Sequence, residues 1–506
     1  MSGGRKKLPP LADSICRQRR VAVITLCFRL RILYLKQMPG EKPFDVTDAE
    51  REVSVSPAAV TAAISGLTPG GGGRRSFRSD QVWSYFGPAF VASVAYIDPG
   101  NFSTNILGGS QFGYRLLWVL LWSNVMAIII QYLAAKLGIV TGLTLPQNCR
   151  KYFSRRASVG LWVCAEVSAV ATDLAEFLGA ALGLDLLIGP TLMAHGISLT
   201  GGLFVSALIA TVAVVGILAL DLAGFQWLER GIMAFVGVIG LCYGFEVFLV
   251  HPDWHRAFVA TILPTFDVHH GSFALRGSVF AAVGMLGATV MPHVIYLHSA
   301  LVQPRLSELS ELGPAGKKAR PKMLRKYLRF ELVDVFVAMN GAWLINSAMI
   351  VMAAVVMYKG PKYYPTIQDA FHTLGPMMGP GAAVVFAVAL LCSGLSSSTV
   401  GVMAGQVIIE GFLDIKFPIF LRRFITVIPA LIVIGIGFDP LKILNDSQVL
   451  LSFTLPAALI PLLLLTNKAG VMGDFRSAVR MRVAGWTVAG IILALNAVLL
   501  VELAIG

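Results

Sequence analysis

The sequence predicts an all-α integral membrane protein with about eleven transmembrane helices. Hydrophobic residues make up 56% of the 506 residues and charged residues only 14%, against about 25% charged residues in soluble domains. From Trp83 onward, apolar segments follow one another closely, and most have the ~20 residues that a helix needs to cross a bilayer. Irregular backbone cannot face lipid, so these segments must be helices. The expected spans are roughly 84–109, 115–140, 158–188, 201–221, 229–250, 277–302, 330–357, 381–411, 421–438, 447–466 and 483–504.

The loops between the spans predict the orientation. Lys and Arg gather in every second loop, as at 150–156 and 305–326, whereas 189–200 and 439–446 hold almost none. Positive charge marks the cytoplasmic side. We therefore expect a multi-pass protein of the plasma or inner membrane, with its N-terminus in the cytoplasm and its C-terminus outside. The net charge of +13 lies in these short loops without interleaved aromatic residues, which argues against nucleic-acid binding.

Residues 1–80 differ in composition from the transmembrane domain expected at 81–506. They are rich in Arg and Lys and contain a glycine run at 70–73. The apolar stretch near 21–35 is too short and too charged for a span, and no cleavage site of a signal peptide follows it. We expect a flexible cytoplasmic tail, with a natural start at Met38 as a second hypothesis. The six cysteines form no CxxC pair, so no disulfide framework is expected.

Two of the expected spans contain a break at corresponding positions. In the first span Pro99 and Gly100 follow Asp98, and in the sixth Pro292 follows Met291. Proline removes an N–H group and clashes with the preceding turn, and carbonyl groups freed in hydrocarbon need partners. Each proline could be a simple kink, but an intramembrane carboxylate beside one of them favours a functional site.

The spacing of the breaks predicts an internal repeat. They lie five spans apart, which indicates two inverted five-helix repeats at about 84–250 and 277–466 and an additional helix at about 483–504. Transporters of that build bind their cargo near the midplane, between two discontinuous helices.

The breaks offer ligands for a cation. Asp98 brings a charged oxygen, Asn101 an amide oxygen and Met291 a thioether sulfur, and carbonyl groups near Ala95 and Ala288 could add two oxygens. Hard ions such as Mg²⁺ prefer oxygen shells, whereas a thioether favours softer metals. Divalent transition-metal ions are therefore the expected substrates, bound transiently, unless Met291 only fills space. No other cofactor is expected.

At these residues the sequence resembles the natural resistance-associated macrophage proteins, also called divalent metal transporters or proton-coupled manganese transporters. The resemblance runs from about Trp83 to the end, although Val294 stands where many members have Asn. It implies a LeuT-like fold and proton-coupled import of Mn²⁺, Fe²⁺, Cd²⁺ or Co²⁺ by alternating access. It also implies metal ligands at Asp98, Asn101, Met291 and the carbonyls of Ala95 and Ala288, with Gln448 joining in some states. The motifs that carry it are Asp98-Pro99-Gly100-Asn101, Met291-Pro292-His293, Tyr296-Leu297-His298-Ser299, Gly405-Gln406 and Glu410-Gly411-Phe412-Leu413.

A proton route is expected beside the metal site. Three carboxylates of the third span recur at spacings of seven and three, so they share one helical face, and two arginines open the ninth span. Such charges are unfavourable in a membrane unless they pair or reach water. Two histidines near the metal site could pass protons on, and the resemblance supports a polar network here. The residues are Glu166, Asp173, Glu176, Arg422, Arg423, His293 and His298.

Other functions are less well supported by the sequence. It contains neither a phosphate-binding GxxxxGK[ST] motif nor HExxH, and we expect no enzyme. The alternative is a transporter of the same fold for Mg²⁺ or for a sodium-coupled organic solute. The expected partners are metal ions, protons and the lipid bilayer, and we expect a monomer.

Overall fold

The computed structural model describes residues 87–219, 225–266, 272–303, 313–361, 363, 367–378, 380–416 and 419–505. This described part is helical and contains no β-strand. The predicted tail at 1–80 and the alternative start at Met38 lie outside it.

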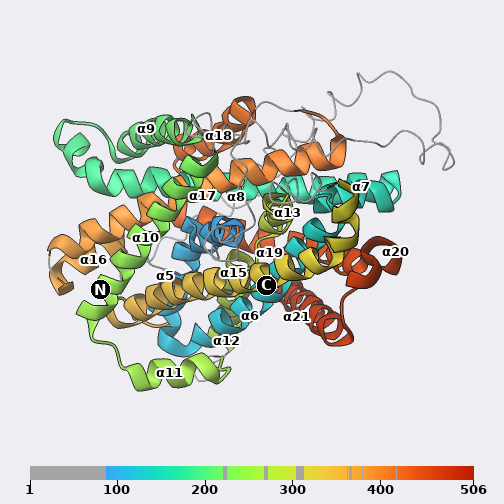
Figure 1. Ribbon diagram of the computed structural model, residues 1–506. Coiled ribbons are helices and arrows are strands. Elements are labelled where there is room, and N and C mark those ends of the chain that lie inside the picture. The colour runs from blue at the N-terminus through green and yellow to red at the C-terminus, as the bar shows by residue number, and fades with distance from the viewer. Residues whose placement is uncertain are drawn as a thin grey trace, which may run out of the picture. The chain divides into compact units, whose positions relative to one another are not determined.

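The first half of the described chain contains one broken and several long helices (Figure 1). Its elements are α4 (Pro88–Val94), η3 (Ala95–Ile97), α5 (Pro99–Phe112), η4 (Gly113–Leu116), α6 (Leu117–Thr141), α7 (Leu145–Tyr152), α8 (Arg155–Ala194), α9 (Leu199–Ala219), α10 (Phe225–Val250) and α11 (Trp254–Ile262).

The second half begins with another broken helix. Its elements are α12 (Ser272–Thr289), α13 (Pro292–Leu301), α15 (Gly313–Val356), α16 (Ile367–Met378), α17 (Pro380–Leu413), α18 (Ile419–Ile436), α19 (Pro440–Asn467), α20 (Ala469–Met472), η6 (Gly473–Phe475) and α21 (Val479–Ile505).

The long apolar helices lie where the sequence predicts spans, whereas the short helices α7, α11, α16 and α20 lie between the predicted spans. Among the described residues, nine helices are long and apolar enough to cross a membrane, with Pro99–Thr141 taken as one of them. Two shorter apolar helices, Pro88–Ile97 and Thr426–Ile436, fall within the first and ninth expected spans. The multi-spanning helical class is confirmed, while the count of eleven crossings and the two-repeat division stay predictions.

Both breaks have the same backbone cause. Asp98 (φ −78°, ψ 169°) and Met291 (φ −85°, ψ 126°) are extended, and each precedes a proline that begins the next helix. A residue before proline avoids the helical region, and proline is well suited to the first helical position. The Asp98 side chain accepts the N–H of Asn101 and so caps α5.

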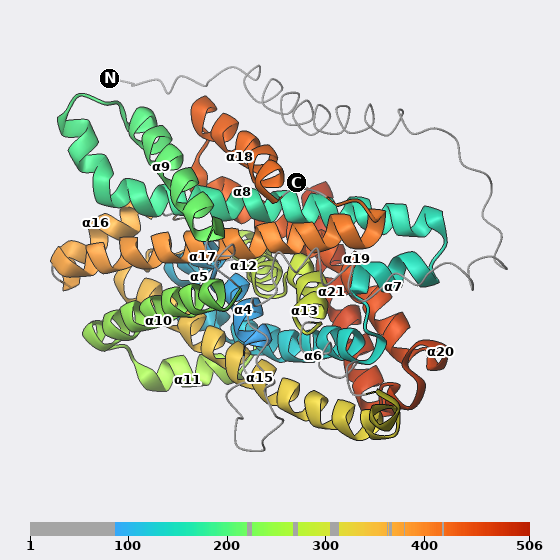
Figure 2. The ribbon, with the colours of Figure 1, turned by 45° about the horizontal axis from the view of Figure 1, so that its top comes forward.

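The broken helices lie inside the helix assembly (Figure 2). In that view α4, α12 and α13 lie between α8 and α17 on one side and α6 and α15 on the other. In the most apolar 18 residues of Gly277–Leu301, 94% are buried, against 22% in the most apolar 18 residues of Trp227–Val250 in α10. The two proline breaks are therefore shielded from lipid by the surrounding helices.

Small residues let α8 and α17 approach each other closely. A Cβ atom added at Gly183 would overlap the backbone of Leu391, and one added at Gly394 would overlap the backbone of Ala180. Close approach of this kind is typical of packing between membrane helices. The two helices lie side by side in both ribbon views, so α17 is held firmly against the helix that carries Glu166, Asp173 and Glu176.

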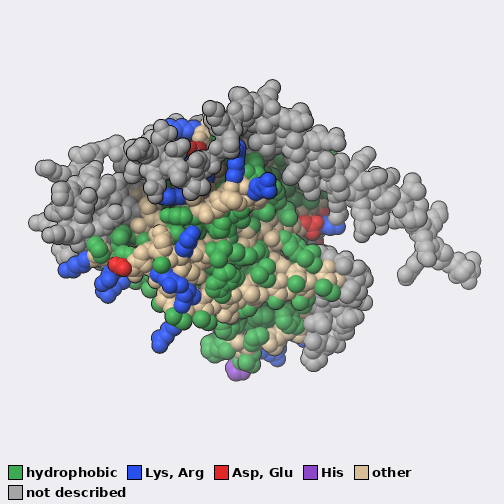
Figure 3. Space-filling model, turned by 90° about the vertical axis from the view of Figure 1, so that its right-hand side faces the viewer, with side chains coloured by type: hydrophobic (Ala, Val, Ile, Leu, Met, Phe, Trp, Pro, Cys, Tyr) green, Lys and Arg blue, Asp and Glu red, His purple; other side chains and the backbone are tan. Residues whose placement is uncertain are grey.

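The outer surface is apolar, as lipid contact requires. Figure 3 shows a broad hydrophobic area on one face of the molecule, with Lys and Arg gathered toward one side of it. Leu241 and Phe248 of α10 are 76% and 77% exposed. Exposed apolar side chains on this scale are expected where a protein meets a bilayer.

Candidate metal site

The two breaks meet through Asp98, Asn101 and Ala288. Asp98 Oδ1 accepts hydrogen bonds from the Asn101 backbone N–H (2.8 Å) and from Asn101 Nδ2 (2.7 Å). Asn101 Nδ2 also donates to the carbonyl oxygen of Ala288 (2.9 Å) in the other broken span. These contacts hold a carboxylate, an amide and a freed carbonyl side by side.

Gln448 of α19 joins this group. A Cβ atom at Gly100 would overlap the Gln448 side-chain amide and come within 3.0 Å of Asp98 Oδ2, so the amide lies against the first break. A Cβ atom at Gly287 would overlap the carbonyl oxygen of Gln448. The glycines at 100 and 287 thus make room for α19 beside both breaks.

The other two predicted ligands are also enclosed. Met291 and Ala95 are both fully buried, Met291 at the start of α13 and Ala95 at the start of η3. The carbonyl groups after Ala95 have protein partners, because Asn346 Nδ2 donates to Tyr96 (2.6 Å) and Ser393 Oγ donates to Ile97 (2.5 Å). Sequence reasoning missed Asn346 and Ser393, which fix the first break to α15 and α17.

Several acceptor atoms at this junction have no hydrogen-bond partner in the described part of the chain. Asp98 Oδ2, Asn101 Oδ1 and Gln448 Oε1 accept no hydrogen bond from the described residues, and all three side chains are fully buried. Buried polar atoms normally have partners. A bound cation would supply a partner for all three oxygens at once, so the donor set fits a metal ion.

The predicted charged network exists in part. Arg422 Nη1 lies 3.4 Å from Glu166 Oε1, and Arg422 Nη2 lies 3.9 Å from Asp173 Oδ2. The side chains of Glu166, Asp173, Glu176 and Arg422 are all buried. The side chain of Arg423 lies outside the described residues.

Two glycines of α17 accommodate these charges. A Cβ atom at Gly405 would overlap the Arg422 guanidinium, and one at Gly401 would overlap Glu176 and approach Asp173 Oδ1 to 2.8 Å. Gly401 and Gly405 are four residues apart and so lie on one face of α17. Glu176 therefore lies beside Asp173.

His293 connects the metal site to this network. Its Nδ1 lies 3.2 Å from Thr172 Oγ1, and Thr172 directly precedes Asp173 on α8. Arg422 also lies close enough to His293 for its positive charge to interact with the imidazole ring. Thr172 was not among the residues that the sequence singled out.

His298 belongs to a different set of contacts. Its Nδ1 lies 2.9 Å from Gln131 Oε1, and its Nε2 lies 2.9 Å from Glu331 Oε1. Gln131 Nε2 donates to the Tyr96 hydroxyl (2.7 Å), beside the first break. An amide oxygen only accepts, so His298 Nδ1 carries a proton and the contact with Glu331 needs a second one, on either partner. Glu331 and Gln131 were also missed in the sequence.

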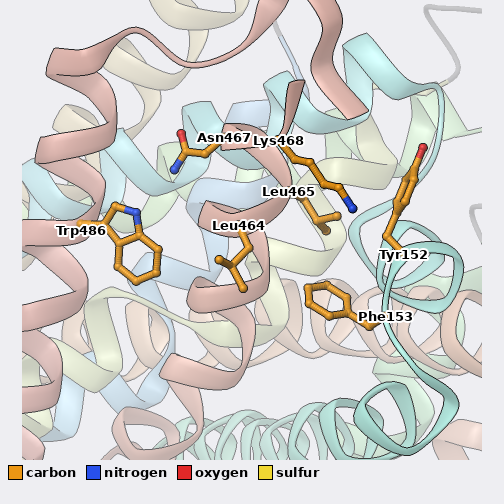
Figure 4. Close-up of a pocket in the computed structure, with 7 residues that line it drawn as sticks. All are labelled: Tyr152, Phe153, Leu464, Leu465, Asn467, Lys468 and Trp486. Carbon is orange, nitrogen blue, oxygen red and sulfur yellow. The ribbon is translucent and has the colours of Figure 1, made fainter. Parts of the chain in front are cut away.

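A pocket of about 370 Å³ lies away from all these residues (Figure 4). Tyr152 and Lys468 face each other on one side of it, and Trp486 lies on the other. Leu464 contributes to its apolar wall. Aromatic and basic side chains beside leucine are typical of the membrane interface rather than of an enclosed metal site.

Comparison with known proteins identifies the family. A family model described as natural resistance-associated macrophage protein-like matches residues 89–502. The chain belongs to this family. It is 45% identical over 416 residues to the divalent metal cation transporter MntH of Caldanaerobacter subterraneus subsp. tengcongensis, covering 82% of this chain and 92% of the relative. It is 42% identical over 428 residues to MntH of Bacillus subtilis, covering 85% and 94%.

A solved structure supports the same assignment. The chain superimposes on a mutant of the Eremococcus coleocola manganese transporter with a TM-score of 0.71 and 30% identity, covering 84% of this chain and 88% of that one. As a member of this family, the protein is a multi-pass membrane transporter of metal ions. The family is one of transporters rather than enzymes.

Proposed function

We propose that this protein imports Mn²⁺ and related divalent transition metals together with protons, by alternating access in a LeuT-like arrangement of eleven spans. The observation that carries the proposal is the junction of the two breaks, where three buried oxygens have no hydrogen-bond partner among the described residues. Asp98, Asn101 and Gln448 supply these oxygens, and Met291 supplies sulfur. Fe²⁺, Co²⁺ and Cd²⁺ suit the same mixed donor set.

Two groups of residues are suited to move protons. His293, through Thr172, leads from the metal site toward Asp173 and Arg422. His298 and Glu331 form a second, separate pair that can share a proton. We assign the first group to coupling because it begins beside the metal ligands, and because a cation entering there alters the field on His293.

The proposed membrane location and orientation are inferred from the sequence. The alternation of basic loops supports a cytoplasmic N-terminus and an outside C-terminus in the plasma or inner membrane. The broken helices are enclosed within one chain, which is consistent with a working monomer. An Mg²⁺ transporter or a sodium-coupled organic-solute transporter remains the competing function, and the thioether of Met291 disfavours both.

Proteoliposome transport tests the proposal directly. We expect an inward pH gradient to speed Mn²⁺ uptake, and Mn²⁺ addition to acidify the lumen as reported by a trapped pH dye. A sodium gradient should have no such effect. Rapid Mn²⁺ uptake without lumenal acidification would show a metal transporter that is not coupled to protons.

Met291→Ala should weaken selection against hard ions. The thioether sulfur binds transition metals and contributes little to the binding of Ca²⁺ or Mg²⁺. Its loss should therefore reduce the uptake of Cd²⁺, the softer ion, more than that of Mn²⁺. We expect excess Ca²⁺ to compete with Mn²⁺ in the variant and not in the wild type, because specificity is a difference of affinities. The measurement is Mn²⁺ and Cd²⁺ uptake with and without Ca²⁺.

Met285→Ala is the matched control. Met285 is a fully buried methionine of α12, in the same broken span, and belongs to an apolar cluster that also contains Phe112 and Leu116. The Met285→Ala substitution removes the same type of side chain and leaves the junction of the two breaks intact. Equal Ca²⁺ competition in both variants would assign Met291 to packing.

A further inference from the structure

The face of α10 that is buried in the protein includes a carboxyl group, that of Glu246. Residues spaced at helical intervals along this face are apolar or aromatic and at most 1% exposed, and Glu246 continues the same face with 0% exposure. Leu241 and Phe248, on other faces of the helix, are largely exposed. The buried positions before Glu246 are Leu228, Ile232, Ile239 and Tyr243.

Glu246 has no partner for its charge in the described structure. Neither carboxyl oxygen accepts a hydrogen bond from the described residues. Its electrostatic neighbours are Tyr243 and Cys242 on its own helix, and Cys392 of α17 lies near Cys242. The helices packed on α10 are α4, α9, α15, α16 and α17, and they bring no described Lys, Arg, His, Asp or Glu into electrostatic contact with Glu246.

A proton suits this carboxyl better than a metal ion does. An isolated carboxylate buried in an apolar environment is very unfavourable and normally becomes neutral by taking up a proton. A dication would need several further ligands, and the described residues contain no group of three or more His, Cys, Asp or Glu that could hold one. The Tyr243 hydroxyl, also without a hydrogen-bond partner in the described structure, cannot replace them.

The position of Glu246 relates it to the metal site. The Tyr243 ring packs edge-on against Phe102, with ring centroids 5.4 Å apart, and Phe102 also lies 6.3 Å from Phe386 of α17. Phe102 directly follows the predicted ligand Asn101. Glu246 lies about one turn beyond Tyr243 toward Val250, which is the outer end of α10 in the proposed orientation.

We propose that Glu246 is a proton-binding group of the outer half of the transporter, holding a proton while the outer side is closed and releasing it when opening admits water. The inference rests on the proposed orientation and on alternating access, but not on proton coupling of metal uptake. The closed state then holds one proton more than the open state. Above the pH at which the open-state carboxyl titrates, the closed-to-open ratio falls about tenfold per pH unit.

Two measurements on the full chain without metal test this proposal. Infrared spectroscopy should show a protonated carboxyl band in the wild type near neutral pH, which Glu246→Gln removes. Backbone hydrogen exchange in α5 and the outer end of α10, corrected for its intrinsic pH dependence, should become faster in the wild type as pH rises from about 6 to about 8. In Glu246→Gln it should change less than about twofold over the same range.

Asp185→Asn provides the matched control. Asp185 of α8 is also a buried carboxyl, but it accepts a hydrogen bond from Ser206 Oγ (3.3 Å), and its variant should follow the wild-type pH profile. Glu246→Asp should retain the pH dependence, which covers the case in which the Gln variant folds poorly. Exchange in Glu246→Gln that accelerates with pH as in the wild type, or an unchanged infrared band, would overturn the proposal. Both readouts stand even if Mn²⁺ uptake proves independent of protons.

Discussion

Asp98→Asn should abolish measurable Mn²⁺ binding and uptake while leaving the protein folded. Asn also caps helices well, so the hydrogen bond to the Asn101 N–H and the start of α5 should survive. The negative charge at the junction is lost, and the dication then meets only neutral oxygens and one sulfur. Mutating groups that merely orient metal ligands lowers affinity about 10–100-fold, so loss of the carboxylate should exceed a factor of about 100.

Asp439→Asn is a close match for this change. Asp439 also precedes a proline, and it caps α19 by accepting the Leu441 N–H (3.0 Å), but it is exposed. Titration calorimetry with Mn²⁺ should give wild-type affinity for this variant and no heat of binding for Asp98→Asn. Retained affinity in Asp98→Asn would remove Asp98 from the ligands.

The breaks could be located from the sequence because their cause is local. A proline excludes the helical region for the residue before it, so Asp98-Pro99 and Met291-Pro292 predict a break wherever they occur in an apolar span. The fold class could also be predicted from the sequence, because a protein that spans lipid needs long apolar helices with few charged residues. Helix ends were less predictable, since polar residues continue α8 and α15 beyond the apolar stretches.

Partners from other helices could not be inferred in this way. Asn346 and Ser393 bind the carbonyls of the first break from more than 240 residues away in sequence, and a polar residue in a span does not reveal its partner. The contact between Glu331 and His298 could not be predicted from the sequence for the same reason. The glycines at 401 and 405 become informative only when Asp173, Glu176 and Arg422 are seen to occupy the space beside them.

Arg422→Ala should destabilise the protein strongly at neutral pH and uncouple proton movement. The Arg422 side chain is 2% exposed and lies beside Glu166 and Asp173, so its loss removes a cation from the neighbourhood of two buried carboxylates. Removing one partner of a buried ion pair costs about 3–5 kcal/mol. Mn²⁺ binding at the junction should persist wherever the protein remains folded, because no metal ligand is changed, whereas lumenal acidification during uptake should fall sharply.

The pH dependence separates this electrostatic effect from simple loss of packing. Low pH neutralises carboxylates in general, so the loss of a neighbouring cation should matter least there, and the variant should approach wild-type stability at low pH and lose stability as pH rises. Arg150→Ala serves as the control, because Arg150 pairs with Asp414 (3.1 Å) at the surface, where ion pairs contribute about 0–1 kcal/mol. Unfolding temperatures of the purified proteins across pH provide the measurement. A deficit in Arg422→Ala that is the same at every pH would mean that the arginine fills space and does not balance the two carboxylates.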